Sequence, residues 1–155
     1  MILEEKIAKL LTRKQKTLSI AESCTGGLLA NRITNVPGSS GFFQLGLVVY
    51  SNKAKIKLLR IPKNAIVKYG AVSQKVAQSM ATSVRKLVGS DFGIAITGIA
   101  GPTGATKDKP VGLVYVALCS KNKTLCYKFL FKGTRTAIKS LAATKTLQLF
   151  SEFIT

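Results

Sequence analysis

The sequence predicts a single-domain α/β protein, a three-layer α/β/α sandwich built around a mixed β-sheet. Segments with strand and helix patterns alternate through the first hundred residues, which is typical of parallel strands covered by helices. Two apolar segments near 111–118 and 125–131 are separated by a short polar link, which predicts an antiparallel hairpin. The 155 residues, 46% of them hydrophobic, suffice for one core, and no linker divides them, so we expect one domain over residues 1–155.

The first half of the chain should alternate regularly. Apolar residues at helical spacing predict a helix over about 3–14, and Thr17 to Ala21 reads as a strand. A second helix should extend to about Thr34, followed by a turn-rich loop and a buried strand over 42–50. Gly46 inside that strand indicates a bulge or a close approach of another element.

The second half adds more helices and the hairpin. Ser51 and Asn52 should cap a short helix, Pro62 should separate it from a segment near 65–69, and a longer helix should begin near Ser73 and end at Gly89. A strand over 92–96 then leads into a glycine-rich loop over 97–106. After the hairpin, the segment 133–135 should open the last helix.

Composition limits the chemistry. The chain has no histidine, which excludes Ser-His-Asp and Cys-His catalysis and the usual histidine-based metal sites. The three cysteines, Cys24, Cys119 and Cys126, follow no metal-ligand pattern, and their odd number argues against a disulfide framework. Any hydrolytic chemistry must therefore take its base from Lys, Tyr, Asp, Glu or a bound metal, and we expect a protein without a resident metal or cofactor.

The net charge of +18 arises from 24 Lys and Arg against 6 Asp and Glu. Such a balance can mark a nucleic-acid-binding protein, but the basic residues are scattered singly and no aromatic stripe accompanies them. We interpret them as a solvated lysine-rich surface that attracts anionic substrates, with no specific nucleic-acid partner. The N-terminus is amphipathic rather than a signal peptide, and no apolar run could span a membrane, so we expect a cytoplasmic protein with no membrane partner.

The segment from Ser19 to Gly27 is the first candidate for a functional site. It reads as a strand end, a polar corner and a helix start, with Ser23 and Thr25 as helix N-cap candidates. A hydroxyl at such a corner lies among unpaired helix N–H groups, which suit an oxyanion or a phosphate, and Gly26 and Gly27 allow close approach. An ordinary capped helix would explain the same residues.

A lysine near a strand end could serve such a serine as a base. Lys55 follows the strand ending near Tyr50 by about one helical turn, so it could point back over the sheet edge, whereas Lys53 lies on another helical face. Burial would lower its pKa and favour the neutral amine that a base requires. Alternatively, Lys55 is a solvent-exposed helix lysine and Tyr50 is a core residue with a satisfied hydroxyl.

Two loops could complete a pocket beyond the strand ends. Ser39 and Ser40 lie in the turn-rich loop, where they could also simply cap or turn the chain. The loop from Thr97 to Thr106 is neither a dinucleotide-binding fingerprint nor a P-loop, but its successive N–H groups could hold an anion.

Several motifs together resemble the CinA C-terminal family, the nicotinamide-nucleotide amidases. They occur in family order over nearly the whole chain: Ala21 to Gly27, Gly38 to Ser40, Tyr50 to Asn52 with Lys55, Gly70 to Ser73, Thr97 to Pro102, and Lys109 to Gly112. The resemblance implies an α/β/α fold and hydrolysis of the carboxamide of nicotinamide mononucleotide to nicotinic acid mononucleotide and ammonia, a step of pyridine nucleotide salvage.

The resemblance also assigns roles. It makes Ser23 the nucleophile and Lys55 its partner in a serine–lysine mechanism, with Tyr50 beside them. Residues expected to bind the nucleotide substrate are Thr25, Gly26, Gly27, Ser39, Ser40, Asn52, Thr97, Gly98, Gly101 and Arg135. A homo-oligomer is also implied, as is an additional N-terminal domain in many relatives.

Two departures from the family pattern bear on activity. Thr103 and Ala105 occupy a loop that is usually richer in glycine, and Lys139 stands where an arginine is expected. A lysine cannot reproduce a bidentate arginine contact. The alternative reading is therefore a weakly active or inactive member of the family that binds nucleotides and has a regulatory role.

Overall fold

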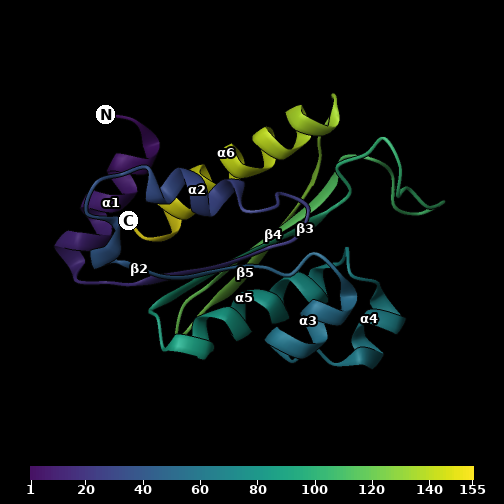
Figure 1. Ribbon diagram of the computed structural model, residues 1–155, viewed down its shortest axis with the longest axis horizontal. Helices are drawn as coiled ribbons and strands as arrows, with labels where there is room; N and C mark the ends of the chain where they lie inside the picture. Colours follow the sequence, from purple (N-terminus) through teal and green to yellow (C-terminus); the bar gives the residue numbers. More distant parts are fainter.

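The computed structural model describes residues 1–155 and shows a sheet between two layers of helices (Figure 1). The strands are β1 (Leu18–Glu22), β2 (Phe43–Val48), β3 (Phe92–Gly98), β4 (Leu113–Cys119) and β5 (Thr124–Leu130). The helices are α1 (Leu3–Lys14), α2 (Leu28–Thr34), α3 (Asn52–Leu59), α4 (Lys63–Tyr69), α5 (Gln74–Val88) and α6 (Arg135–Phe153), with a short 3-10 turn, η1 (Ser39–Gly41). The predicted fold class is confirmed.

The sheet has the strand order β2-β1-β3-β4-β5 and is mixed, as predicted. β1 pairs in parallel with β2 and β3, whereas β3, β4 and β5 are antiparallel neighbours. Glu22 at the end of β1 lies opposite both Val48 of β2 and Ile96 of β3. The segments that follow these three strands therefore leave the sheet at the same edge.

The two helical layers cover opposite faces of the sheet. Helices α1, α2 and α6 enclose one apolar cluster, and α3, α4 and α5 enclose the other (Figure 1). On the second face, α5 lies so close to β3 that a Cβ at Gly93 would clash with the carbonyl oxygen of Ala81. Only glycine therefore allows this helix its position against the strand.

Gly46 likewise marks a close approach. A Cβ added there would lie 3.0 Å from the Phe43 ring and 3.2 Å from the Ala30 methyl group of α2. The irregularity of the strand is elsewhere, because the register with β1 shifts between Leu18 and Ser19 and passes over Gln44. Of the two predicted explanations for Gly46, the structure supports close approach.

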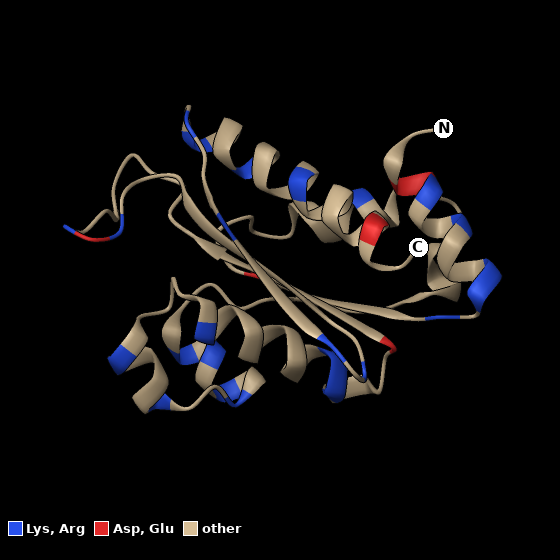
Figure 2. Cartoon of the chain, turned by 180° about the vertical axis from the view of Figure 1, so that it is seen from behind, with Lys and Arg blue, Asp and Glu red and all other residues tan.

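Positive charge is spread over both helical layers, and few acidic residues interrupt it (Figure 2). No Asp or Glu occurs between Glu22 and Asp91, a stretch that includes all of α3, α4 and α5. No helix combines the length and apolarity needed to cross a lipid bilayer.

Candidate active site

The turn after β1 carries Ser23 and is fixed by the carboxylate of Glu22. This side chain is 1% exposed and accepts hydrogen bonds from Thr25 Oγ1 (2.6 Å), Leu29 N (2.9 Å) and Ala30 N (3.0 Å). Glu22 therefore satisfies the first N–H groups of α2, which a capping residue would otherwise do. The prediction that Ser23 or Thr25 caps α2 is wrong, since the N-cap position belongs to Gly27 and has no side-chain cap.

Lys55 reaches the same turn from α3. Ser51 caps this helix by accepting a hydrogen bond from Ala54 N, as the sequence predicts, and Lys55 then points back toward the sheet edge. Its Nζ lies 2.9 Å from Ser23 Oγ, 2.9 Å from the carbonyl oxygen of Val49 and 3.2 Å from that of Tyr50. Lys55 is 1% exposed, so the alternative of a solvent-exposed helix lysine is excluded.

Burial shifts Lys55 toward its neutral form. Burial lowers the pKa of Lys55 from its ordinary 10.5, and the influence of Cys24 opposes this only in part. A neutral amine has two N–H bonds and one lone pair. The protonated amine can donate to Ser23 Oγ and to the carbonyl oxygens of Val49 and Tyr50. In the neutral form the two carbonyls, which can only accept, use the two N–H bonds, and the lone pair is left for the Ser23 hydroxyl. In the neutral form, this arrangement is suited to a serine activated by a lysine base.

Tyr50 contributes its backbone rather than its hydroxyl to this pair. Its carbonyl oxygen lies 3.2 Å from Lys55 Nζ and 3.5 Å from Ser23 Oγ. The ring is 59% exposed, which excludes the reading of Tyr50 as a core residue, and its hydroxyl accepts a hydrogen bond from Arg135 (2.9 Å). Arg135 also donates to the carbonyl of Gly101 (2.7 Å), so it ties the start of α6 to the glycine-rich loop.

A pocket of about 300 Å³ opens in front of this pair. Predicted site residues that line it are Ser23, Tyr50, Asn52, Lys55, Thr97, Gly98, Gly101 and Arg135. Thr97 is held in place by donating through Oγ1 to the carbonyl of Ala71 (2.9 Å). Three loops that are distant in sequence thus meet at one sheet edge.

The other residues of the Ser23 turn have different places. The Thr25 hydroxyl is engaged by Glu22, and the Gly26 N–H donates to the carbonyl of Ser23 (3.1 Å), so it is not free to bind an oxyanion. The N–H groups of Cys24 and Thr25 donate to no acceptor in another residue. Gly27 has a φ of 99°, which suits glycine at the start of α2.

Ser39 and Ser40 are not brought to this pocket. They form η1, which precedes β2, whereas Tyr50 and Asn52 follow it. Because β1 and β2 are parallel, residues before β2 lie at the opposite edge of the sheet from Ser23. Within one chain, Ser39 and Ser40 therefore do not join the site of Ser23, in contrast to the prediction.

The sequence reasoning missed three contributions, from Val49, Glu22 and Val72, and gave Lys139 no place in the site. The carbonyl of Val49 and the carboxylate of Glu22 act through contacts that no local pattern reveals. Val72 lines the pocket and could have been found from the motif at 70–73. Lys139 lies one helical turn beyond Arg135, and a Cβ built on Gly26 would lie 3.6 Å from its Nζ. Lys139 therefore adds positive charge beside the Ser23 turn.

Two other kinds of chemistry, a cysteine nucleophile and a metal site, are less well supported by the side chains around the pocket than a serine nucleophile. Cys24 borders the pocket, but burial raises the pKa of its thiol to about 11, so it is protonated near neutral pH. No group of three or more Cys, Asp or Glu side chains comes together as a metal-binding cluster.

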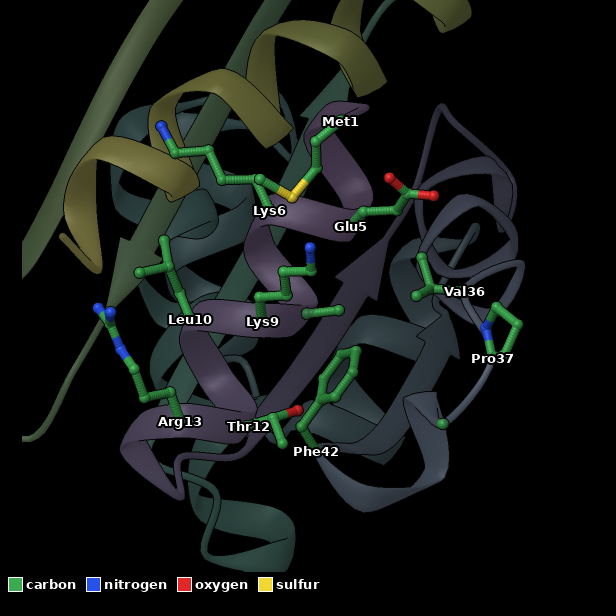
Figure 3. A pocket seen from close by; sticks show the side chains of 12 residues that line it. Met1, Glu5, Lys6, Lys9, Leu10, Thr12, Arg13, Val36, Pro37 and Phe42 are labelled. Atoms are coloured by element: carbon green, nitrogen blue, oxygen red, sulfur yellow. The ribbon is translucent and has the colours of Figure 1, made fainter.

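A larger hollow of about 940 Å³ lies between α1 and the loop that precedes β2 (Figure 3). Its labelled side chains include Lys9, Leu10, Val36, Pro37 and Phe42, and no serine lies against a lysine there. Its charged and hydroxyl side chains form no hydrogen-bonded pair of a nucleophile and a base, so the smaller pocket beside Ser23 is the candidate active site.

Comparison with known proteins identifies the family of the chain. The model of the CinA C-terminal domain matches residues 1–154. Proteins named competence-damage inducible protein from Desulforudis audaxviator (strain MP104C) and Alkaliphilus oremlandii (strain OhILAs) are each 48% identical, over 97% and 95% of this chain. The chain spans 37% and 36% of the length of these two relatives.

Solved structures agree in fold over nearly the whole chain. A CinA superfamily protein from Klebsiella pneumoniae 700603 superposes with a TM-score of 0.95 at 30% identity, covering 98% of this chain and 95% of its own. The competence/damage inducible protein CihA from Agrobacterium tumefaciens gives 0.91 at 35% identity, covering 96% and 93%. The chain therefore belongs to the CinA C-terminal domain family.

Proposed function

We propose that the protein hydrolyses the carboxamide of nicotinamide mononucleotide to nicotinic acid mononucleotide and ammonia. The observation that carries the proposal is the 2.9 Å contact between Lys55 Nζ and Ser23 Oγ, in a setting where two carbonyls engage the remaining amine hydrogens. Family membership supports the substrate, and the pocket in front of the pair supports a small molecule.

The first half-reaction transfers the acyl group to Ser23. Lys55 accepts the hydroxyl proton while Ser23 Oγ attacks the carboxamide carbon, giving a tetrahedral oxyanion. The N–H groups of Cys24 and Thr25, which donate to no other residue, are the donors we propose for this oxyanion. The protonated Lys55 then gives its proton to the amide nitrogen, the C–N bond breaks, and ammonia leaves an ester on Ser23.

The second half-reaction restores the enzyme. Water enters where ammonia left, and Lys55 takes a proton from it as its oxygen attacks the ester carbon. Collapse of the second tetrahedral intermediate breaks the ester bond, and Lys55 returns the proton to Ser23 Oγ. The carboxylic acid product ionises in solution.

The phosphate of the nucleotide requires positive charge at the mouth of the pocket. We propose that Arg135 and Lys139, one turn apart on α6, supply it. Arg135 now donates to Gly101 and to the Tyr50 hydroxyl, so phosphate binding would exchange these neutral acceptors for a charged one. Asn52, Thr97, Gly98 and Gly101 would contact the rest of the substrate.

Purified protein should be incubated with nicotinamide mononucleotide while ammonia and the deamidated product are measured together. We expect equal amounts of both, and none from Ser23→Ala. Full activity in Ser23→Ala would remove the proposed nucleophile. Thermal stabilisation by the nucleotide without product would instead favour a binding or regulatory member of the family, the role that the altered glycine-rich loop suggests.

A further inference from the structure

The helical layer formed by α3, α4 and α5 carries a second concave site that the amidase proposal does not use. A pocket of about 420 Å³ lies between the α3–α4 connection, the outer side of α5 and the start of β5. Arg60 and Lys75 bring positive charge to it, and Gln78, Ser79 and Ser83 bring amide and hydroxyl groups. Ile61 is its one large hydrophobic residue.

Five polar side chains of this pocket are free to bind a ligand, whereas the hydroxyls of Thr82 and Thr124 contact Cys119 Sγ. Arg60, Lys75, Gln78, Ser79 and Ser83 make no side-chain hydrogen bond within the chain. The two ion pairs of the protein join Lys16 to Asp91 and Arg32 to Glu4, so neither cation of the pocket has a carboxylate partner. The two cations, Arg60 and Lys75, line the pocket together with the hydroxyl donors Ser79 and Ser83, and this combination is complementary to an oxyanion.

The wider surface strengthens this charge. The segment 51–90, which forms the whole layer, contains nine Lys and Arg residues and no Asp or Glu. In Figure 2 the helices of this layer carry Lys and Arg (blue) and no Asp or Glu (red). A carboxylate nearby would weaken anion binding, and none occurs in these helices.

Arg60 borders the pocket from the C-terminal end of α3. Arg60 ends α3 with a φ of 55°, a left-handed conformation in which glycine is usual, and only Gln15 among the other non-glycine residues has a positive φ. Glycine would fit this backbone at least as well, so Arg60→Gly removes the guanidinium without straining the turn.

We propose that this pocket, bounded by Arg60 and Lys75, is a second anion-binding site that takes a small phosphorylated ligand. The concave shape and the pair of cations fit one or two phosphate groups. An extended nucleic acid would instead need a continuous basic groove with stacking aromatic rings, and no aromatic residue lines this pocket. The proposal is independent of the amidase reaction, because no residue of this pocket borders Ser23.

Pyrophosphate titrated calorimetrically at 150 mM salt tests the site. We expect saturable binding of pyrophosphate, with the same affinity in Arg135→Met. Because Arg135 lines the candidate active site, unchanged binding in this variant would show that pyrophosphate binds elsewhere. Arg60→Gly and Lys75→Met should each weaken binding at least tenfold. The glycine variant suits the left-handed backbone, so its unfolding midpoint should be equal to or higher than that of the original chain.

Two variants serve as matched controls. Gln15→Gly places glycine at the other left-handed position, which is not part of the pocket, and Lys86→Met removes a surface charge of α5 outside the pocket. Both variants should bind pyrophosphate with an affinity within twofold of that of the original chain. Equal weakening in Lys86→Met, loss of binding in Arg135→Met, or no saturation at all would overturn the proposal. Saturable binding of a single-stranded oligonucleotide without binding of pyrophosphate would assign the surface to nucleic acid instead.

Discussion

Lys55 holds a titratable amine in a place that water scarcely reaches. Replacing it with Met keeps most of its aliphatic length and removes the proton acceptor. We expect Lys55→Met to lower the turnover of nicotinamide mononucleotide by at least about a hundredfold, the range of a general base. Nucleotide binding, measured by calorimetry, should fall much less, because the proposed phosphate contacts lie on α6.

Lys53→Met is the matched control for this variant. Lys53 is exposed and lines no part of the pocket, so its loss removes the same formal charge without touching Ser23. Equal losses of turnover in the two variants would point to electrostatic steering and would count against proton transfer by Lys55.

The lowered pKa of Lys55 also predicts how stability depends on pH. Between the folded pKa and the ordinary 10.5, the unfolded chain binds more protons than the folded chain, so the free energy of unfolding should rise with pH across this window. Below the folded pKa the penalty for burying the charged amine is complete. Urea denaturation at several pH values should show this rise in the original chain and a smaller rise in Lys55→Met.

Activity should follow the same titration. Only the neutral amine can accept the Ser23 proton, so the rate should increase with pH up to a plateau above the folded pKa of Lys55. A rate that falls as pH increases through this range would contradict the proposed base.

At the scale of elements, the junction between β1 and α2 depends on a single buried carboxylate. In Glu22→Gln one carboxylate oxygen becomes an amide donor, which must face either the Ala30 N–H or the donors Thr25 and Leu29. We expect a loss of about 1–3 kcal/mol in the free energy of unfolding, the usual effect of an unsatisfied buried group. Urea denaturation would measure it.

Thr25→Val provides the graded comparison. It removes one of the three hydrogen bonds to Glu22 and keeps the shape of the side chain, so its effect on stability should be the smaller of the two. A larger loss in Thr25→Val would mean that Glu22 is not what fixes this turn.

Element positions followed closely from local patterns in the sequence. The periodic apolar residues of α1 predicted its bounds, Ser51 and Ser73 marked the starts of α3 and α5, and Gly89 ended α5. The N-terminus of α2 was predicted wrongly, because its N–H groups are satisfied by Glu22 from the preceding strand rather than by a residue at the cap position. Such a contact depends on the path of the turn, which spacing does not encode.

The site was predictable only in part for a related reason. Ser23 and Lys55 lie 32 positions apart and meet because β1 and β2 are parallel and end together. The same parallel pairing places Ser39 and Ser40 at the other edge, so strand direction would have separated them from the pocket. The use of the Tyr50 carbonyl in place of its hydroxyl depends on side-chain orientation, which the sequence does not reveal.

At the scale of the whole molecule, the charge of +18 should govern how substrate arrives. Nicotinamide mononucleotide carries a net negative charge near neutral pH, so added salt should screen its attraction and raise KM with little change in kcat. The corresponding nucleoside lacks the phosphate and keeps the positive ring, so its KM should respond in the opposite direction. Steady-state rates at low and high salt would reveal both trends.

Assembly of several copies remains a prediction at this scale. Light scattering at working concentration should give a mass that is a multiple of the 16.6 kDa chain. A single mass equal to that of one chain would contradict it.

The protonated thiol beside the nucleophile has a practical consequence for labelling experiments. Burial raises the pKa of Cys24 to about 11, so at neutral pH its thiol is almost entirely protonated and therefore a poor nucleophile. Electrophiles of the fluorophosphonate type, which select activated serines, should therefore modify Ser23 without competition from the adjacent sulfur. Peptide mapping of the labelled protein would then report directly on the reactivity of the serine, free of the thiol background that complicates covalent probes in many hydrolase pockets.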